Sequence, residues 1–241
     1  MLIVEPNRRD AAREGNGGDR EVRGLMPGGA FAHYNLGVSY LKRGRYEEAL
    51  EALKVAVHLK PDDADAYMHL GKAFGGLDRN EEAVEAYKVA MKLKPDYAEA
   101  HYNLGLAYGL LGRYEEALAE CSEAVRLEPE DAEVHASLGV AYIGLGRNEE
   151  AVEAHREATL LEPDNSRGHY GLGVACLALG RDEEALEALK EAIRLKPDHA
   201  ETHYFLGLVY AKLGDREAAM GEHAVLEELN QDMADRLVEH L

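Results

Sequence analysis

The chain has no tryptophan, three phenylalanines and two cysteines in 241 residues, and its 46 acidic residues far outnumber its 27 basic ones. Two cysteines cannot build a disulfide framework. No apolar run approaches the roughly eighteen residues of a membrane-spanning helix, and the charge at Glu5 interrupts any signal-peptide core. The formal net charge of −19 repels phosphate backbones. We therefore expect no nucleic-acid partner and no membrane insertion.

The sequence does have a repeat with a period of 34 residues. Prolines, Leu-Gly pairs, alanines and Glu-Glu pairs all recur at this spacing. The prolines are Pro61, Pro95, Pro129, Pro163 and Pro197, and the Leu-Gly pairs begin at Leu36, Leu70, Leu104, Leu138, Leu172 and Leu206. So many coincidences at one period indicate a repeat architecture. The six repeats cover residues 30-63, 64-97, 98-131, 132-165, 166-199 and 200-233.

Each repeat has the pattern of two helices joined by a tight turn. Apolar residues three and four apart in segment 102-108 indicate the first helix, and Gly112 suits a left-handed turn residue. The second helix opens on Glu115-Glu116, where acidic residues favour the helix dipole, and ends before Pro129. Aspartates that suit the N-cap region of the next repeat follow four of the prolines: Asp62, Asp96, Asp164 and Asp198.

Two segments lie outside the repeats. Residues 1-29 hold six glycines, five arginines and five acids without an apolar period, which predicts a flexible tail. A segment that docks in a groove of this chain or of a neighbouring one, and an unusual N-terminal cap, are the alternatives. Residues 234-241, with Leu237, Val238 and Leu241, predict an amphipathic capping helix over the last repeat.

The repeat resembles the tetratricopeptide repeat (TPR) family, whose pattern combines an aromatic residue, Leu-Gly, a second aromatic, Ala, a third aromatic and Pro. Repeat 2 supplies Tyr67, Leu70-Gly71, Phe74, Ala83, Tyr87 and Pro95. The first aromatic is replaced in five repeats by His33, His101, His135, His169 and His203, and Gln231 replaces the last proline. The resemblance implies an all-α fold: a right-handed α-solenoid of six helix-turn-helix units with a C-terminal capping helix.

The resemblance also implies a binding surface, because the first helix of each TPR unit lines a concave groove. The predicted partner-binding groove residues are Tyr34, Asn35, Val38, His69, Lys72, Tyr102, Asn103, Leu106, Val140, Tyr170, Val174, Tyr204, Phe205 and Leu208. Aromatic and aliphatic side chains suit a binding floor, and the two asparagines can bond a ligand backbone. The alternative is that the tyrosines pack between neighbouring helices and bind nothing in particular.

The charged residues at the predicted groove positions indicate what kind of partner to expect. The second positions of four first helices are acidic, namely Asp65, Glu99, Glu133 and Glu201. We therefore predict a protein or peptide with apolar anchors and some positive charge. Only Lys72 and Arg167 are basic at groove positions, so the TPR clamp for carboxylate-ended ligands is not expected.

The acidic excess is concentrated in repeats 3 and 4, which carry net charges of −6 and −5. Much of it falls on their second helices, at Glu120, Glu123, Glu128, Glu153, Glu157 and Glu162. A solvated outer face explains these residues, and a second docking face for a basic partner is the alternative.

The sequence gives little support for chemistry. The repeated histidines lie one per repeat, and helix axes about 8–10 Å apart keep them from sharing an ion with ligands at about 2 Å. Cys121 and Cys176 occupy aromatic slots, which predicts buried, reduced thiols. Nucleophile elbows, Walker loops and dinucleotide fingerprints are absent from the sequence. We predict no metal, no cofactor and no enzymatic activity.

The sequence thus predicts a cytoplasmic, non-enzymatic scaffold or adaptor that binds a partner peptide or helix in the concave groove. The alternative is a self-assembling structural protein whose tail and terminal repeats pack against other copies. A regulatory subunit of an enzyme on another chain is a third reading, which the sequence does not separate from the first.

Overall fold

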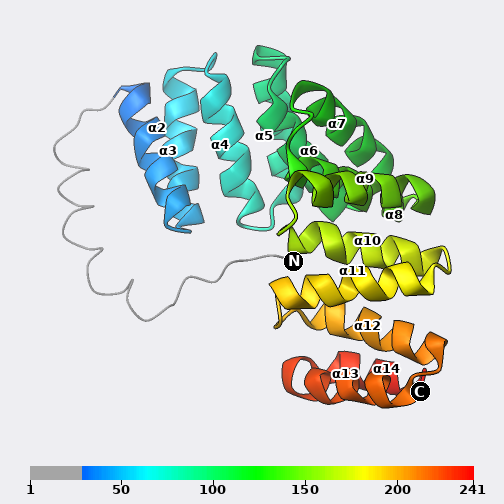
Figure 1. The fold of residues 1–241 in the computed structure, drawn as a ribbon. Helices are drawn as coiled ribbons and strands as arrows, with labels where there is room; N and C mark the ends of the chain where they lie inside the picture. The colour runs from blue at the N-terminus through cyan, green and yellow to red at the C-terminus, as the bar shows by residue number, and fades with distance from the viewer. Residues whose placement is uncertain (1–28) are drawn as a thin grey trace. The chain divides into compact units, whose positions relative to one another are not determined.

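The computed structural model describes residues 29–241. The predicted tail therefore lies, except for Gly29, outside the described residues. Within residues 29–241 the secondary structure is helical, without strands. The chain divides into two compact parts, one ending at Ala107 and one spanning Tyr108–Leu241. We call them the N-terminal body and the C-terminal body (Figure 1).

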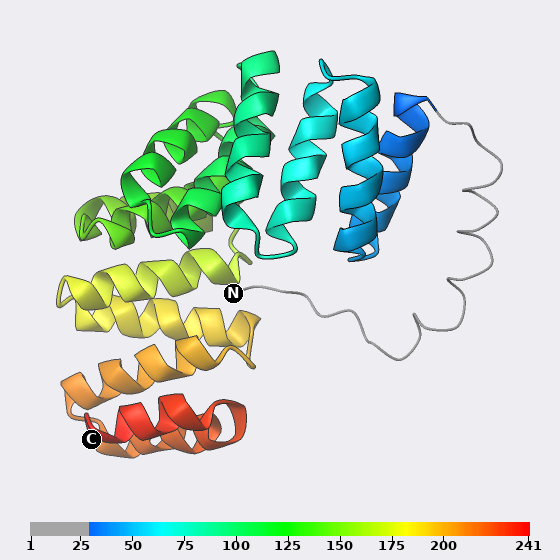
Figure 2. The same ribbon diagram turned by 180° about the vertical axis from the view of Figure 1, so that it is seen from behind.

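The first helix of each repeat is termed the A helix and the second the B helix. The N-terminal body contains α2 (Ala30–Lys42), α3 (Tyr46–Leu59), α4 (Ala64–Gly75), α5 (Asn80–Leu93) and most of α6 (Ala98–Leu110). The C-terminal body contains α7 (Tyr114–Leu127), α8 (Ala132–Gly144), α9 (Asn148–Leu161), α10 (Ser166–Ala178), α11 (Asp182–Leu195), α12 (Ala200–Leu213), α13 (Arg216–Leu229) and α14 (Gln231–Val238). Helices consecutive in sequence pack side by side within each body (Figure 2).

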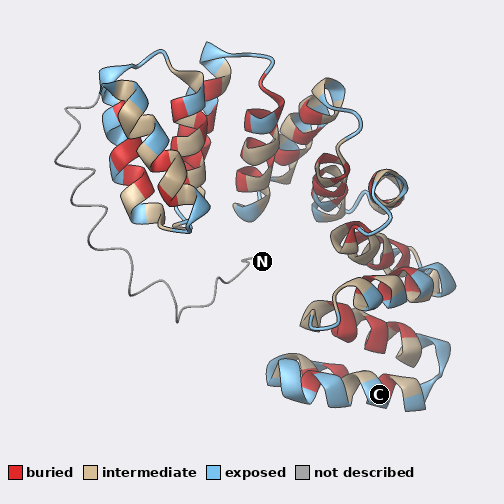
Figure 3. Ribbon diagram, turned by 60° about the vertical axis from the view of Figure 1, so that its left-hand side comes forward, coloured by how far each residue is buried: buried red, intermediate tan, exposed pale blue. Residues whose placement is uncertain are grey.

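The A and B helices of one repeat meet at the glycine of the Leu-Gly pair. A Cβ atom at Gly71 would lie 2.4 Å from Cε1 of Tyr87, and one at Gly173 would lie 2.5 Å from Cγ of Leu189. The large B-helix side chain therefore rests directly on the A-helix backbone. Figure 3 shows the result, with buried residues on the helix faces that meet and exposed residues at the turns.

The turn between the A and B helices needs a residue with positive φ. Gly44, Gly112, Gly146, Gly180 and Gly214 have φ between 68° and 81°, as the spacing of these glycines predicts. Repeat 2 has no glycine in this slot. Asp78 adopts φ 58° there and is the only non-glycine residue with positive φ in the described part of the chain.

An arginine at the N-cap of the B helix contacts both helices that flank this turn. Arg147 stacks over the Tyr142 ring, with 4.7 Å between Cζ and the ring centroid. Its Nε also donates to Glu150 Oε1 at 2.9 Å, which holds the pKa of Glu150 below its usual range. Arg45, Arg79 and Arg113 make the same pair of contacts. The second glutamate of the first four Glu-Glu pairs thus has a specific partner as well as a favourable place in the helix dipole, and in the fifth pair Glu184 bonds Arg156 of α9 instead.

The repeated histidines hold the proline turn that precedes their own helix. Nε2 of His135 donates to the carbonyl oxygen of Pro129 at 2.9 Å, across six residues. His101, His169 and His203 bond Pro95, Pro163 and Pro197 in the same way. A tyrosine or tryptophan ring would also fill this slot, but the imidazole adds an internal hydrogen bond to the carbonyl group of the turn proline.

The A-helix N-cap lies one residue after the position that the sequence predicts. Asp63, Asp131 and Asn165 cap α4, α8 and α10 through their side-chain oxygens. The aspartates that follow the prolines, such as Asp62, instead belong to the turn itself. Asp62, Asp96, Asp164 and Asp198, which the sequence places in the N-cap region, lie one residue before the cap itself, because the turn takes two residues, Pro and Asp, before the helix begins.

The C-terminal capping helix is present but begins earlier than predicted. It spans Gln231–Val238 rather than residues 234-241, because the Asn230 side chain caps it by accepting from the Met233 N–H. Leu237 is fully buried, and Ala234 packs with it against Leu226 and Tyr204. The helix covers the face of repeat 6 that a further repeat would otherwise cover.

One core side chain breaks the rule that buried polar atoms are bonded. His155 of α9 is fully buried, and neither ring nitrogen has a hydrogen-bond partner. Its ring lies between two A helices, against Gly139 of α8 and Gly171 of α10. Burial, with a smaller contribution from Arg167, lowers the pKa of His155 to about 3. The imidazole is therefore neutral at neutral pH and packs in the core as an apolar side chain would.

The turn of repeat 2 offers a stabilising substitution. Asp78→Gly should raise the free energy of unfolding by about 0.5–1 kcal/mol, because glycine adopts positive φ without a Cβ penalty. Urea titration followed by circular dichroism measures the change. The matched Gly112→Asp variant should lose a similar amount, and a destabilised Asp78→Gly protein would contradict the assignment of strain to this turn.

His155 predicts an acid sensitivity. Since its pKa is about 3 in the folded chain and about 6.5 when unfolded, only the unfolded chain takes up the proton between these values. Stability should therefore fall as the pH drops below about 6.5. His155→Leu, which installs the residue found in repeats 1 and 5, should gain about 1–3 kcal/mol at pH 7 and flatten the acid limb of the unfolding curve. An unchanged pH profile in this variant would contradict the interpretation.

Candidate functional site

The predicted groove residues all lie on A helices, and most of them are half-buried. Asn35 and Val140 are exposed. Tyr204 is the exception in the other direction, because only 8% of its surface is exposed. Its ring packs with Leu226, Ala234 and Leu237 and lies beneath the Arg236 guanidinium. Tyr204 therefore contributes to the capped end of the C-terminal body and offers little surface to a ligand.

In the N-terminal body the site surface is partly aromatic and partly amide. The rings of Tyr34 and His69 pack edge to face, with centroids 5.3 Å apart, and join α2 to α4. Burial and nearby acids raise the pKa of Tyr34, so its hydroxyl stays protonated. Asn103 uses its amide N–H to bond the Glu99 carbonyl at 2.6 Å, which leaves its side-chain oxygen as an acceptor.

In the C-terminal body the equivalent surface is an aromatic cluster. Tyr170 of α10 packs edge to face with His199, at 5.1 Å between centroids, and with Phe205 of α12, at 5.9 Å. Burial raises the pKa of Tyr170 to about 12 and lowers that of His199. Both rings are therefore neutral at neutral pH. His199 was not among the predicted groove residues, because it precedes the A helix rather than lying on it.

The acidic residues of the N-terminal groove surface already have partners. Asp65 accepts a hydrogen bond from the Tyr97 hydroxyl at 2.7 Å, which raises the pKa of that tyrosine further above the effect of burial. Glu99 forms an ion pair with Lys72 of the preceding A helix. The one basic residue that the sequence places in this part of the groove is therefore occupied as well.

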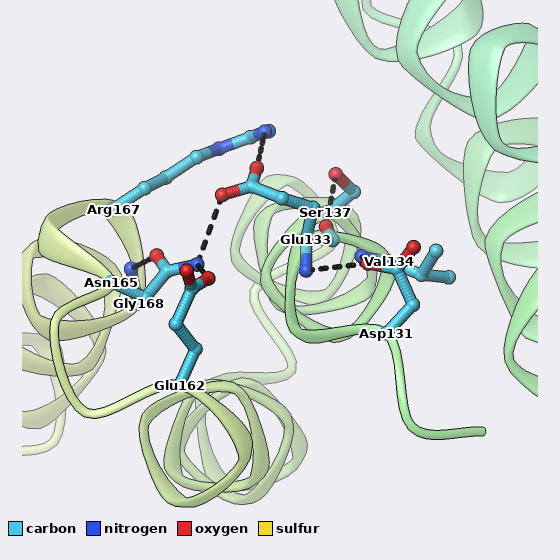
Figure 4. A network of polar contacts seen from close by, with 8 residues as sticks. All are labelled: Asp131, Glu133, Val134, Ser137, Glu162, Asn165, Arg167 and Gly168. Atoms are coloured by element: carbon cyan, nitrogen blue, oxygen red, sulfur yellow. Dashed lines mark hydrogen bonds and ion pairs between the residues drawn. The ribbon is translucent and has the colours of Figure 1, made fainter. Parts of the chain in front are cut away.

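The same arrangement recurs in the C-terminal body as a larger network (Figure 4). Glu133 of α8 accepts from the Asn165 side chain at 2.9 Å and from Arg167 at 3.2 Å. The Asn165 amide also donates to Glu162 at 3.1 Å, while its oxygen caps α10 through the Gly168 N–H at 2.7 Å. Asn165 is buried, so a single amide joins the end of α9 and the starts of α8 and α10.

The remaining acid of the row, Glu201, lies 3.5 Å from Nε2 of His199. Three of the four acids of the predicted negative row, Asp65, Glu99 and Glu133, thus have hydrogen-bond or ion-pair partners, whereas Glu201 lies beside a neutral imidazole. The positive charge and the apolar anchors of the expected partner both stay predictions. The residues next to Asp65, Glu133 and Glu201 are Tyr97, Asn165 and His199, and each is the last residue of its repeat. The sequence pattern assigns no role to this position.

The described residues also bear on the chemistry that the sequence leaves open. Among residues 29–241, no three His, Cys, Asp or Glu side chains gather as metal ligands would. Cys121 and Cys176 are buried as predicted, and burial raises the pKa of the Cys121 thiol to about 12. In the same range no helix is long and apolar enough to cross a membrane.

The repeats, their glycine contacts and the capping helix agree with comparisons to known proteins. The model of the cilia and flagella-associated protein 70 C-terminal domain, a TPR family, matches residues 6–235. The chain belongs to this TPR family. The all-α fold that the sequence predicts, a solenoid of TPR units, is thereby confirmed.

Solved TPR structures resemble the chain at low sequence identity. Cut9 in its APC/C complex with Hcn1 aligns with a TM-score of 0.80 and 21% identity, over 91% of this chain and 44% of the other. PilF from Pseudomonas aeruginosa aligns at 0.76 and 21%, over 93% and 100%. MamA from Desulfovibrio magneticus RS-1 aligns at 0.64 and 28%, over 70% and 95%. This chain thus spans less than half of Cut9. No curated protein sequence matches.

The hydrogen bonds of Asn165 predict that substitutions at this residue lower the stability of the fold, whatever their effect on partner binding. Asn165→Ala should lower the free energy of unfolding by about 2 kcal/mol, because it removes an N-cap and a donor to two carboxylates. Thermal and urea unfolding measure the loss. Asn165→Ser keeps a capping oxygen but is too short to donate to the two carboxylates, and it should lie in between; if it equalled wild type, the bonds to Glu133 and Glu162 would contribute nothing.

Proposed function

We propose that this TPR protein is a non-enzymatic scaffold or adaptor that binds a partner peptide or helix against the groove-facing side of its A helices. The observation that carries the proposal is the contrast within that surface. Its two basic side chains, Lys72 and Arg167, are paired with Glu99 and Glu133, whereas Tyr170, Phe205 and the residues around them leave aromatic surface half-exposed. A surface of this kind gains affinity from burying apolar groups.

The same contrast indicates which chemical groups a partner needs. A partner needs large apolar side chains to use the aromatic cluster and backbone groups to meet Asn35 and the acceptor oxygen of Asn103. Positive charge on the partner is of secondary value, since Asp65, Glu99 and Glu133 would have to exchange an internal partner for it. A related structure, YrrB, is described as a TPR protein with an unusual peptide-binding site; it shares 23% identity, and its TM-score is 0.62. It supports the class of function.

Substitutions in each body test the proposal. Tyr102→Ala with Leu106→Ala changes the N-terminal surface, and Tyr170→Ala with Phe205→Ala changes the C-terminal one. Affinity capture from source-cell lysate, with mass spectrometry of the bound proteins, should show a partner that wild type retains and one or both variants lose by about tenfold or more. Circular dichroism should show unchanged helicity.

The control removes similar apolar area from the outer face. Val55→Ala with Leu59→Ala changes two B-helix side chains that are 39% and 52% exposed, and it should leave capture unaffected. If the groove variants and this control retained the same partners, the groove assignment would be wrong. Capture of only further copies of this chain would favour the self-assembling alternative.

A further inference from the structure

The ends of two B helices in the C-terminal body carry charges of the wrong sign. The residue at the C-cap is Lys60, Lys94 and Lys196 in repeats 1, 2 and 5, but Glu128 and Glu162 in repeats 3 and 4. A cation at a helix C-terminus complements the partial negative charge of the unpaired carbonyl groups, and a carboxylate opposes it. Repeats 3 and 4 therefore give up a favourable contact that their neighbours make.

A second departure lies in the last turn of α9. Its penultimate residue is Leu160, whereas the other repeats carry His58, Lys92, Arg126, Arg194 and Glu228 in this slot. The leucine is 75% exposed, and α9 has no basic residue in its last turn. An isolated exposed leucine is ordinary. Here it replaces a charged residue at the same helix end that already bears the unfavourable Glu162.

Glu128 and Glu162 line a hollow of about 690 Å³ on the C-terminal body, and Leu160 directly precedes Leu161, which lines it too. Its lining residues are Glu128, Pro129, Glu130, Asp131, Ala132, Leu161 and Glu162. Asp131 is committed to capping α8, and Glu162 accepts from Asn165. Glu128 and Glu130 are exposed and have no ion-pair partner in the described part of the chain. The hollow thus combines three apolar residues, Pro129, Ala132 and Leu161, with unpaired carboxylates and two helix C-termini.

We propose that this acidic hollow and Leu160 beside it form a second docking surface, separate from the groove-facing side of the A helices. The partner it fits is a protein segment that carries lysine or arginine together with a large aliphatic side chain. Charge complementarity identifies the occupant, because repeats 3 and 4 carry −6 and −5 and both α7 and α9 end at the hollow. The locally unfavourable residues are explained if a bound cation satisfies them.

The probe is a fluorescein-labelled synthetic peptide of about 16 residues, with leucine and lysine spaced for an amphipathic helix. Fluorescence anisotropy with the full chain gives its affinity, and a twin peptide with glutamate in place of lysine should not bind. The test variant, Glu128→Lys with Leu160→Arg, installs residues that other repeats carry in these slots. It should weaken binding of the lysine peptide by about tenfold or more. Its thermal midpoint should rise, because the helix dipoles regain cations.

Three controls can overturn the proposal. Glu187→Lys makes the same charge change as Glu128→Lys on α11, so an equal loss there would mean non-specific attraction to an acidic protein. Tyr170→Ala with Phe205→Ala should leave this peptide unaffected; if it abolished binding while the hollow variant did not, the peptide would occupy the groove-facing surface. If Arg8→Gln with Arg9→Gln strengthened peptide binding, the occupant would be the chain's own N-terminal segment rather than a partner.

Discussion

The two helices of a repeat can approach each other only where the A helix has no side chain, and the rest of the structure depends on this contact. The glycine of the Leu-Gly pair is constant, while the residue that rests on it varies from Tyr87 to His155 to Leu189. The constant glycine, rather than the varying large residue, therefore determines how closely the two helix backbones approach. Repeats with different large residues can then stack with the same geometry, which lets one array bury a continuous core.

Charged side chains hold neighbouring repeats in register. Lys72 with Glu99, and Arg167 with Glu133, each join A helices of adjacent repeats on the side predicted to face the groove. Arg156 of α9 and Glu184 of α11 do the same between B helices. Single exposed pairs of this kind contribute little free energy. Their value lies in position, because each pair leaves the apolar floor between them free of unpaired charge.

The sequence predicts the repeat period, the helix pairs and the positive-φ glycines because these follow from local chemistry repeated six times. It also places Cys121 and Cys176 in the core, since their slots are aromatic elsewhere. What it misses depends on neighbouring repeats. The bond from Tyr97 to Asp65 spans 32 residues and involves the last position of a repeat, which the repeat pattern does not single out. The burial of Tyr204 depends on α14. The sequence pattern places the start of this helix too late, because it does not identify Asn230 as the N-cap. The binding role of the predicted groove residues stays a prediction.

The unbonded imidazole of His155 has a consequence for where the array comes apart. Repeat arrays ordinarily fray from their terminal repeats, whose outer faces lack a neighbour. In this chain α14 and its cap secure the C-terminal end. His155, by contrast, lies between α8 and α10, in the interior, and can take up a proton readily only when those helices separate. Protonation of His155 therefore favours separation of α9 from α8 and α10, which is a seam inside the C-terminal body rather than at its end.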